Sequence, residues 1–442
     1  MRPNAYVIKS TIVAALGGLL FGFDTAVISG VTQAITAAYR LSPASLGLTV
    51  ASALIGTIFG AMCAGIPGDR YGRRDSLRIT ALLYFFSALG CALAWNWSSV
   101  MLFRFIGGLG IGGSSVLGPM YIAEIAPAKW RGRLVGVFQF NVIFGILLAY
   151  LSNYVVGRVF PGNDEWRIKL GVAAVPAVLF FLALFTIPRS PRWLVKKGRI
   201  AEARDVLRMT GEAGYEAQLQ GIRLSVDAEH GHAGETLFSR KYRVPILLAV
   251  SIAIFNQLSG INAILYYMND IFSRAGFGKT SGDLQAVVVG ATNMIFTILA
   301  MSIIDKVGRK ILLLIGSIGM GVSLTGVGLV FWTARYENLL VWMLAAFIAF
   351  FGFSQGAVIW VFISEIFPTR VRAGGQSLGS LTHWLMNAMI SWMFPVVAAA
   401  SHSAPFFFFS VAMFVQFFVV LFFFPETKGL SLEELQTKLS IT

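Results

Sequence analysis

The stretch Gly17-Gly-Leu-Leu-Phe-Gly-Phe-Asp24-Thr-Ala-Val-Ile-Ser-Gly30 places one carboxylate inside an apolar segment that is long enough to cross a membrane. Between Lys9 and Gln33, Asp24 is the only acidic residue. A charge at the centre of a bilayer costs about 2.5–3.5 kcal/mol on the insertion scale. We therefore expect Asp24 to be protonated, to face a polar cavity or to be paired with a cation.

The composition around this segment excludes a soluble globular protein. The 442 residues are 56% hydrophobic and 13% charged, and the mean hydropathy is +0.73. We predict an all-α membrane protein with twelve transmembrane helices in two six-helix bundles. Apolar runs of about 20 residues place these helices at 9–30, 45–67, 77–95, 99–122, 134–156, 168–187, 244–272, 284–304, 311–332, 339–363, 374–397 and 405–424.

The net charge of +14 is distributed unevenly between the two sides of the predicted membrane protein. The segments on the side of both termini carry about four times as many Lys and Arg residues as the opposite side, so the positive-inside rule places both termini in the cytoplasm. The opposite side carries Arg40, Arg158, Arg167, Lys169, Arg274, Lys279 and Arg335. The positive charge thus indicates topology and contact with lipid headgroups at the plasma (inner) membrane, and no nucleic-acid partner is expected.

Three cytoplasmic motifs recur at an offset of about 240 residues, which indicates one six-helix unit used twice. They are Asp69-Arg-Tyr-Gly-Arg-Arg74 with Asp305-Lys-Val-Gly-Arg-Lys310, Ala123-Glu-Ile-Ala-Pro127 with Ser364-Glu-Ile-Phe-Pro368, and, more loosely, Pro188-Arg-Ser-Pro191 with Pro425-Glu-Thr-Lys428. We expect an N-terminal bundle at 1–187, a cytoplasmic helical linker at 188–243, a C-terminal bundle at 244–424 and a cytoplasmic tail at 425–442.

The linker contains the only long hydrophilic stretch. Ile200 to Arg208 has helical periodicity, with Ala201, Val206 and Leu207 on one expected apolar face, and Glu212 to Gln220 could form a second short helix. A flexible linker is the alternative.

Several motifs in their joint order resemble the sugar porter family of the major facilitator superfamily, over essentially all of residues 9 to 430. These motifs are Gly22-Phe-Asp24, the two Arg-rich turns, Arg104-Phe-Ile-Gly-Gly108, Pro188-Arg-Ser-Pro-Arg-Trp193, Gln257-Leu-Ser-Gly-Ile-Asn262, Ser364-Glu-Ile-Phe-Pro368 and Pro425-Glu-Thr-Lys-Gly429. The chain is most similar to the bacterial proton-linked pentose and hexose carriers of that family. The resemblance implies proton-coupled monosaccharide transport by alternating access.

The resemblance also pairs Asp24 with Arg104, the one Lys or Arg that lies more than two residues inside a predicted helix. A guanidinium does not lose its proton in proteins, whereas a carboxylate in a wet cavity can gain one. Protonation of Asp24 would then release Arg104 and favour turnover of the loaded carrier. The alternative is a static ion pair. Passive facilitators of the family often carry Asn at the Asp position, so Asp24 favours symport.

Neutral amides and aromatic rings at mid-helix positions form the expected sugar site, because amides both donate and accept hydrogen bonds. On the family's binding positions stand Gln139, Asn256, Gln257, Asn262, Asn293, Trp360, His383, Trp384 and Asn387, with Phe21, Tyr266 and Ile146 as pocket wall. We expect Gly260 to loosen its helix so that Gln257 and Asn262 converge. A single buried amide could instead hold two helices together.

Four departures from the family pattern limit the choice of substrate, and one of them is Ile146, which is apolar where some xylose carriers have a second Gln. Asn256 replaces a Gln, His383 stands where the family tends to have Gln or Asn, and Ala357 replaces a Pro that would bend its helix. Glucose, xylose and related neutral monosaccharides all remain compatible with this set.

The cytoplasmic charges are expected to latch helix ends together when the cytoplasmic side is closed, with topology alone as the alternative. The set is Asp69, Arg73, Arg74, Glu124, Arg131, Arg133, Asp305, Arg309, Lys310, Glu365, Arg370 and Arg372, with Glu124 and Glu365 expected to face the Arg residues that follow them. Arg189 stands where the family usually has Glu, which removes one acidic partner.

The remaining expectations concern partners and competing functions. Cys63 and Cys91 both lie in apolar helices, so no disulfide, metal site or cofactor is expected. No nucleophile–base constellation or nucleotide-binding loop indicates an enzyme or an ATP-driven pump. The expected partners are a monosaccharide, protons and the lipid bilayer, and we expect a monomer. A passive sugar uniporter of the same fold and a membrane sugar sensor are the alternative functions.

Overall fold

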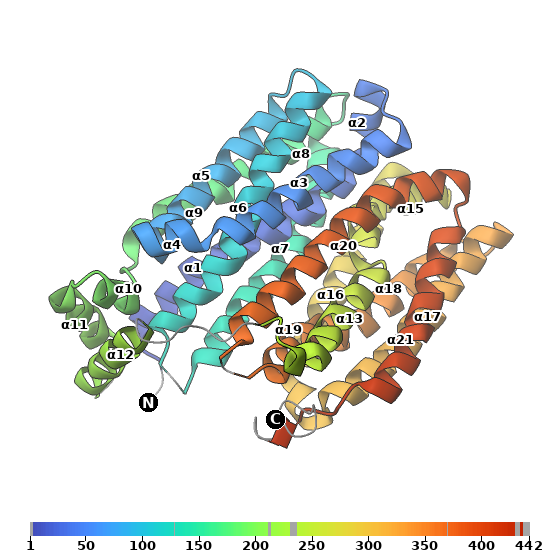
Figure 1. Cartoon of the computed structure of the whole chain (residues 1–442). Helices are drawn as coiled ribbons and strands as arrows, with labels where there is room; N and C mark the ends of the chain where they lie inside the picture. The colour runs from blue at the N-terminus through green and yellow to red at the C-terminus, as the bar shows by residue number, and fades with distance from the viewer. Residues whose placement is uncertain are drawn as a thin grey trace. The chain divides into compact units, whose positions relative to one another are not determined.

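The computed structural model describes residues 3–127, 129–210, 214–229, 237–368, 370–428 and 434–435, except the side chains of Met301 and Asp305. Within these ranges the regular structure is entirely helical, without a β-strand (Figure 1). The helices form two compact units: unit 1 contains Met1–Val31 and Ser52–Ala233, and unit 2 contains Thr32–Ala51 and Gly234–Thr442. Helix α3 (Pro43–Cys63) runs across the boundary.

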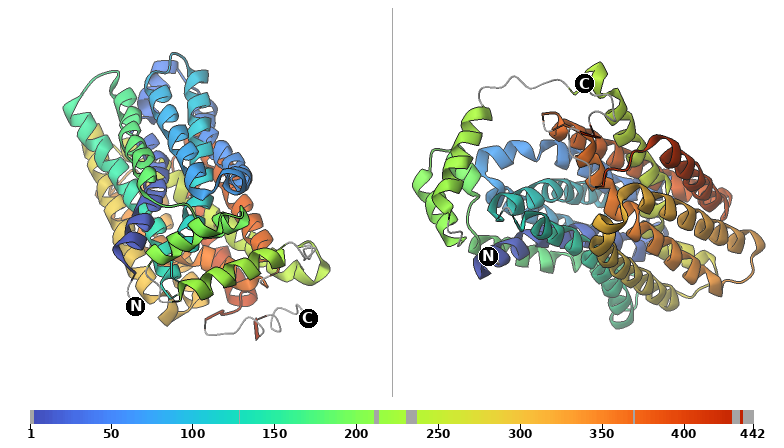
Figure 2. Two further views of the ribbon diagram at one scale, coloured as in Figure 1. Left: turned by 90° about the vertical axis from the view of Figure 1, so that its left-hand side faces the viewer. Right: turned by 90° about the horizontal axis from the view of Figure 1, so that it is seen from below.

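Unit 1 contains the helices of the first sequence half, except α2 and the first part of α3, and three short helices that follow them. These are α1 (Ala5–Val27), η1 (Ile28–Gly30), α4 (Gly65–Tyr71), α5 (Arg73–Ala92), α6 (Trp97–Ile125), α7 (Arg131–Val159), α8 (Glu165–Gly171), α9 (Ala174–Ala183), η2 (Leu184–Thr186), α10 (Pro191–Lys196), α11 (Ile200–Met209) and α12 (Tyr215–Glu229). Helices α10 to α12 gather at one end of this unit, beside the start of α1 (Figures 1 and 2). There the Asn4 amide donates to the carbonyl of Met209 over 2.7 Å.

Unit 2 contains the helices of the second half together with α2. These are α2 (Thr32–Tyr39), η3 (Arg240–Tyr242), α13 (Arg243–Leu258), α14 (Ile261–Tyr266), α15 (Met268–Arg274), α16 (Lys279–Val307), α17 (Arg309–Thr333), α18 (Asn338–Phe353), α19 (Gln355–Ile366), α20 (Arg372–Ala400) and α21 (Ala404–Phe423).

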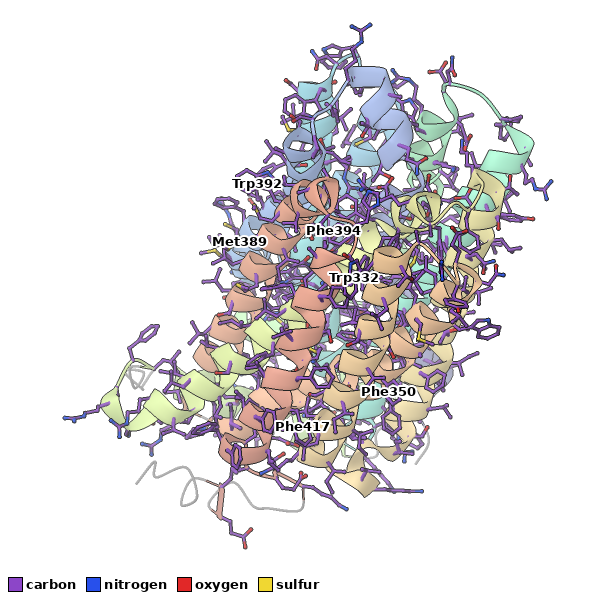
Figure 3. The ribbon with its side chains drawn as sticks, turned by 90° about the vertical axis from the view of Figure 1, so that its right-hand side faces the viewer. Trp332, Phe350, Met389, Trp392, Phe394 and Phe417 are labelled. Atoms are coloured by element: carbon purple, nitrogen blue, oxygen red, sulfur yellow. The ribbon has the colours of Figure 1, made fainter. Side chains whose placement is uncertain are left out.

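Ten helical segments of the described chain are long and apolar enough to cross a membrane. The two other predicted spans are α5 and α20, which are 20 and 29 residues long and whose first turns are polar. Many large apolar side chains of the long helices are exposed, among them Trp332 and Met389, which are labelled in Figure 3. Such a surface is stable against lipid and not against water. The predicted all-α membrane fold is confirmed.

The two halves repeat the same helix packing. In unit 1, α1 packs against α7, and α5 packs against α6 and α9. In unit 2, α13 packs against α20, and α17 packs against α18 and α21, which are the corresponding elements of the second half. The sequence repeat therefore has a structural counterpart in every one of these pairs.

Glycines set the distance between α1 and α7. A Cβ at Gly22 would lie 1.8 Å from the carbonyl oxygen of Val142, and a Cβ at Gly145 would lie 2.1 Å from that of Leu19. Only residues without a side chain allow the two backbones to approach so closely. The contact fixes the position of the helix that carries Asp24.

Several of the predicted spans are interrupted, and two of the breaks lie in helices that carry residues of the expected sugar site. The span expected at 244–272 consists of α13, α14 and α15, and the first break is at Gly260, whose φ of +79° favours glycine. The span expected at 339–363 breaks at Ser354, where the backbone adopts φ −117° and ψ −91°. Ala357 lies inside α19, three residues after the break. The predicted span is therefore interrupted even though it has no Pro at position 357.

The helical prediction for the linker is confirmed, with two corrections. Its first helix, α11, buries Ala203, Val206 and Leu207, whereas Ala201 is exposed. Position 203 lies three and four residues before the other two and therefore shares their face. The second helix, α12, continues to Glu229, because its buried residues Leu219 and Val226 pack on the same small core as Trp193. Glu212 lies outside the described residues.

Candidate functional sites

Asp24 and Arg104 form an ion pair between α1 and α6. The Nη1 of Arg104 lies 3.1 Å from Oδ1 and 3.0 Å from Oδ2 of Asp24, and 3.4 Å from its backbone oxygen. The side chain of Arg104 is 3% exposed and that of Asp24 is 13% exposed. The pair joins two helices at a buried position, which confirms the expectation that a cation is opposite Asp24.

The pair has spare hydrogen-bonding capacity. All three of these contacts use Nη1, and the buried Nε of Arg104 has no acceptor among the described residues. Gly107 lies beside the carboxylate, because a Cβ there would be 3.8 Å from Oδ1 of Asp24. The guanidinium of Arg104 could therefore rotate without breaking hydrogen bonds from its Nε.

Gln257 is the centre of a polar cluster in unit 2. Its Nε2 lies 3.2 Å from Oδ1 of Asn256 and 3.2 Å from both ring nitrogens of His383. Its Oε1 accepts from Nδ2 of Asn262 over 3.1 Å. The left-handed turn at Gly260 brings Asn262 back toward Gln257, as predicted. Four polar side chains thus converge where a helix is broken.

Aromatic rings border this cluster. The His383 ring centroid lies 5.2 Å from that of Trp360 and 5.2 Å from that of Trp384. Trp384 is buried, whereas 37% of Trp360 is exposed. Trp360 therefore offers a free ring face next to hydrogen-bonding groups.

The other predicted amides of unit 2 lie on α20 and α16. Asn387 is fully buried; its Nδ2 donates to the Tyr266 hydroxyl over 3.1 Å, and its Oδ1 accepts from Ser391 over 3.1 Å. Asn293 is buried on α16 against Gly352 of α18, where a Cβ would lie 3.5 Å from its Oδ1.

Three predicted residues belong to unit 1. Gln139 is half-buried on α7 and has no hydrogen-bonding partner in the described part of the chain. Phe21 is half-buried on α1. Ile146 is buried on α7, and its backbone nitrogen packs against Gly22. Their roles as sugar contact or pocket wall stay predictions.

At the end of unit 1 where α10 lies, Glu124 is bound by two groups. Its Oε1 lies 3.0 Å from Nη2 of Arg73, and its Oε2 accepts a hydrogen bond from Ser190. Arg73 also binds Asp69, with 3.1 Å between Nη1 and Oδ1. The carboxylate at the end of α6 is thus tied to α5 and to the start of α10.

The second half repeats this arrangement around Glu365. Its Oε1 lies 2.8 Å from Nη2 of Arg309, and its Oε2 accepts from the hydroxyl of Thr427 over 2.6 Å. Arg309 and Thr427 occupy the repeat positions of Arg73 and Ser190. The two halves therefore build the same three-residue tie.

Several residues of the expected latch lie elsewhere. Arg74 binds Asp75, and the described residues place no carboxylate on Arg131, Arg133, Arg370 or Arg372. In the described part of the chain, Glu124 and Glu365 instead bind the nearer Arg73 and Arg309 and the hydroxyls of Ser190 and Thr427. The Lys310 ammonium binds the carbonyl of Leu421, and the side chain of Asp305 lies outside the described residues.

Sequence reasoning missed the hydroxyl groups Ser190 and Thr427, and also Glu426 and Asp75. Glu426 accepts from the backbone nitrogens of Arg309 and Lys310 over 2.9 and 3.0 Å and so caps α17. The loose repeat of Pro188-Arg-Ser-Pro191 in Pro425-Glu-Thr-Lys428 was the signal that could have found the hydroxyls, because it aligns Ser190 with Thr427.

Comparison with known proteins is consistent with this geometry. A family model described as "Sugar (and other) transporter" matches residues 10–439. The D-xylose-proton symporter of Escherichia coli (strain K12) is 38% identical, with 98% of this chain and 96% of that protein covered. The arabinose-proton symporter of Bacillus subtilis (strain 168) is also 38% identical, with 98% and 94% covered.

Solved structures give the same result. The inward-open xylose transporter of Escherichia coli matches with a TM-score of 0.88 and 36% identity, with 98% of this chain and 100% of that chain covered. The same transporter in a partially occluded inward-open conformation matches with a TM-score of 0.85 and 35% identity, with 96% and 100% covered. The chain therefore belongs to the sugar transporter family.

Proposed function

We propose that the protein is a proton-coupled monosaccharide symporter that works by alternating access. The observation that carries the coupling is the buried Asp24–Arg104 pair. Relatives named as xylose-proton and arabinose-proton symporters, together with a glucose transporter of Staphylococcus epidermidis, support a pentose or hexose as substrate. The transporter is a monomer of the plasma (inner) membrane, and both of its termini are cytoplasmic.

The proton acts on the tie between α1 and α6. With Asp24 ionised, two charge-assisted contacts hold Arg104 to it. A proton delivered from the outside neutralises the carboxylate and removes the electrostatic part of the tie. Arg104 keeps its charge and becomes free to rotate toward another acceptor. Loss of the proton to the cytoplasm restores the pair and resets the carrier.

The sugar is bound mainly by the cluster around Gln257. The amides of Asn256, Gln257 and Asn262 are hydrogen-bonded to one another. Sugar hydroxyls both donate and accept, so they can replace these contacts without leaving an amide unpaired. Trp360 supplies a ring face for the C–H surface of the sugar, and Gln139 adds a contact from unit 1.

Uptake into proteoliposomes tests the function. Under an imposed gradient with an acidic outside, radiolabelled xylose, arabinose or glucose is expected to accumulate above its equilibrium level, and a protonophore abolishes the accumulation. Uptake that only reaches equilibrium under the same gradient contradicts symport and indicates the passive uniporter.

A further inference from the structure

Two buried side chains bind the carbonyl groups at the end of the helix that carries Asp24. Nδ2 of Asn153 on α7 donates to the backbone oxygen of Val27 over 3.2 Å, and Nζ of Lys169 on α8 donates to that of Gly30 over 3.1 Å. Gly30 ends η1, and a Cβ there would lie 2.4 Å from Nδ2 of Asn153. The last carbonyl groups of a helix have no partner inside it and carry partial negative charge, so amide and ammonium groups are favourable ligands for them.

These two contacts continue the tie between Asp24 and Arg104. The backbone oxygen of Asp24 lies 3.4 Å from Nη1 of Arg104, which also contacts the carboxylate. Positions 24, 27 and 30 are three residues apart, so they share one face. Helices α6, α7 and α8 thus each supply one donor to the same face of α1 and η1. Only the contact at Asp24 includes a titratable acceptor, because the other two acceptors are backbone oxygens.

Lys169 differs from an ordinary helix-end cation because it is fully buried. Its side chain is 0% exposed, and that of Glu165, whose Oε1 lies 2.6 Å from Nζ, is 4% exposed. A buried ammonium group is costly unless it is paired and hydrogen-bonded, and Lys169 has both a carboxylate and the carbonyl of Gly30. Replacement of a buried ion pair by apolar residues is often neutral for stability. The pair is therefore not needed merely to fill this position, and its distinctive contact is the one with Gly30.

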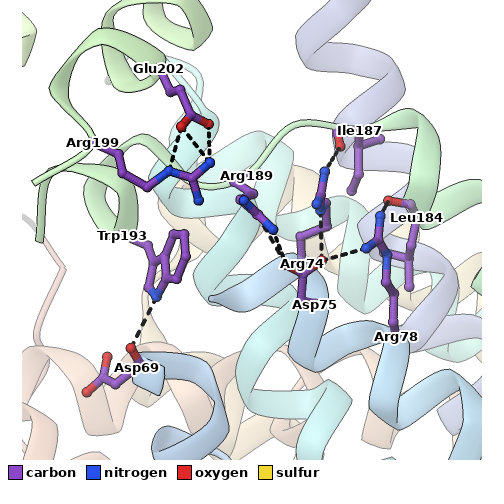
Figure 4. A network of polar contacts seen from close by, with 10 residues as sticks. All are labelled: Asp69, Arg74, Asp75, Arg78, Leu184, Ile187, Arg189, Trp193, Arg199 and Glu202. Carbon is purple, nitrogen blue, oxygen red and sulfur yellow. Dashed lines mark hydrogen bonds and ion pairs between the residues drawn. The ribbon is translucent and has the colours of Figure 1, made fainter. Parts of the chain in front are cut away.

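Unit 1 uses cations on helix-end carbonyl groups elsewhere, but with more exposed side chains. Arg74 and Arg78 of α5 bind the carbonyl groups of Ile187 and Leu184 over 3.2 and 3.3 Å, at the end of η2 (Figure 4). Both arginines are partly exposed and share the carboxylate of Asp75. Residues 174–186, which form α9 and η2, include no titratable side chain. These contacts therefore hold a helix that takes no part in proton transfer, whereas Lys169 holds the helix that carries Asp24.

We propose that Lys169 is a positioning residue for proton coupling, which together with Asn153 fixes the end of α1 so that Asp24 stays in register with Arg104. This role rests on the proposed symport. When a proton neutralises Asp24, the charge-assisted contacts of Arg104 are lost, but the contacts to the backbone oxygens of Val27 and Gly30 remain. The carboxylate is then still in place to re-form the pair when the proton leaves.

Loss of this anchor has a defined consequence. If the end of α1 is no longer held, the pair of Asp24 and Arg104 is loose even when Asp24 is ionised. The loaded carrier can then turn over without a proton, so sugar leaks back down its gradient. Sugar exchange continues, because the residues proposed to bind sugar are unchanged.

Uptake of radiolabelled xylose, arabinose and glucose by the double variant Lys169→Met with Glu165→Leu tests this role. The variant removes both buried charges together, so it is expected to melt like the wild type, but it has no donor to Gly30. Under a gradient of one pH unit, a tightly coupled carrier with one proton per sugar accumulates sugar up to about ten-fold. The wild type is expected to approach this limit and the double variant to stay below about two-fold, whereas counterflow changes by less than about two-fold.

Arg167→Gln is the matched control. It removes the other cation of α8 that binds helix-end carbonyl groups, those of Ala92 and Ala94 at the end of α5, over 3.0 and 2.7 Å. Its accumulation is expected to equal that of the wild type. Asn153→Ala removes the second donor to α1 without a change of charge, and it is expected to lower accumulation about two-fold or more, the worth of one hydrogen bond.

Thermal melting reports whether each variant is folded. Wild-type accumulation by the folded double variant would overturn the proposal, and if that variant melts early, wild-type accumulation by Asn153→Ala would do so. An equal loss in Arg167→Gln would also contradict it, because it would indicate general loosening of unit 1. A wild type that only equilibrates sugar would contradict symport itself, and with it this role, whereas a loss confined to the variants of Lys169 and Asn153 supports the anchor.

Discussion

At the scale of single residues, buried charge in this protein occurs in pairs. Besides Asp24 and Arg104, Lys169 is fully buried with Glu165, with 2.6 Å between Nζ and Oε1, and Lys169 also donates to the carbonyl of Gly30 over 3.1 Å. The charge count treats Lys169 as an ordinary cation of the outer side. Its burial could not be predicted, because it depends on the packing of α8 against η1.

The stability of this pair gives a first prediction. Lys169→Met leaves the carboxylate of Glu165 buried without its cation, which costs about 3–5 kcal/mol. Arg199→Met breaks a pair with Glu202 in which both side chains are well exposed, and it is expected to cost about 0–1 kcal/mol. Denaturant unfolding of the two variants measures the difference. Equal losses would show that Glu165 is solvated or neutral.

At the scale of helices, the close contact of α1 with α7 depends on glycines. The helix breaks at Gly260 and Ser354 occur where the backbone leaves the helical φ and ψ angles. The loosening at Gly260 could be predicted, because glycine has a local conformational effect there, whereas the close approach at Gly22 and Gly145 required the packing of α1 against α7. The break at Ser354 could not, since neither Ser354 nor Gln355 carries a local signal. The convergence of Gln257 with Asn262 followed from Gly260, whereas the contact of Gln257 with His383 required the packing of α13 against α20.

The contact between α1 and α7 gives a second prediction. Gly22→Ala places a Cβ within 1.8 Å of the Val142 carbonyl oxygen, so the helices must separate at a cost of at least about 1–3 kcal/mol. Gly162→Ala adds a methyl group where no atom lies within 4 Å and is expected to be neutral. Melting temperatures of both variants test this. A neutral Gly22→Ala would mean that the two backbones do not approach so closely.

At the scale of the whole molecule, the duplicated half is visible in sequence and structure. The repeated motifs placed Arg73, Glu124, Arg309 and Glu365 in one expected latch, but only the structure shows that Arg73 binds Glu124 and that Arg309 binds Glu365. They did not identify Arg131, Arg133, Arg370 and Arg372 correctly as partners of these carboxylates, because charge near a helix end does not specify which group is nearest. The hydroxyls that complete each tie carry no charge and were therefore not noticed.

The duplicated tie gives a third prediction. Glu124→Gln and Glu365→Gln each remove a charged hydrogen-bond partner, worth about 1.5–3 kcal/mol, from a buried Arg. If these ties bias the conformational equilibrium, each variant is expected to lower the exchange rate about 10- to 100-fold, with little change in sugar affinity. Counterflow measures the rate, and Glu202→Gln, on an exposed pair, is the control. An unchanged exchange rate in both variants would show that these contacts stabilise the fold and do not influence the conformational equilibrium.

Coupling between proton and sugar rests on Asp24, so Asp24→Asn tests it most directly. The amide keeps the shape of the side chain and cannot carry a proton into the cell. In proteoliposomes under an imposed pH gradient, Asp24→Asn is expected to lose sugar accumulation completely while it retains counterflow exchange or downhill flux. Accumulation of sugar by Asp24→Asn against its gradient would contradict proton coupling through this residue.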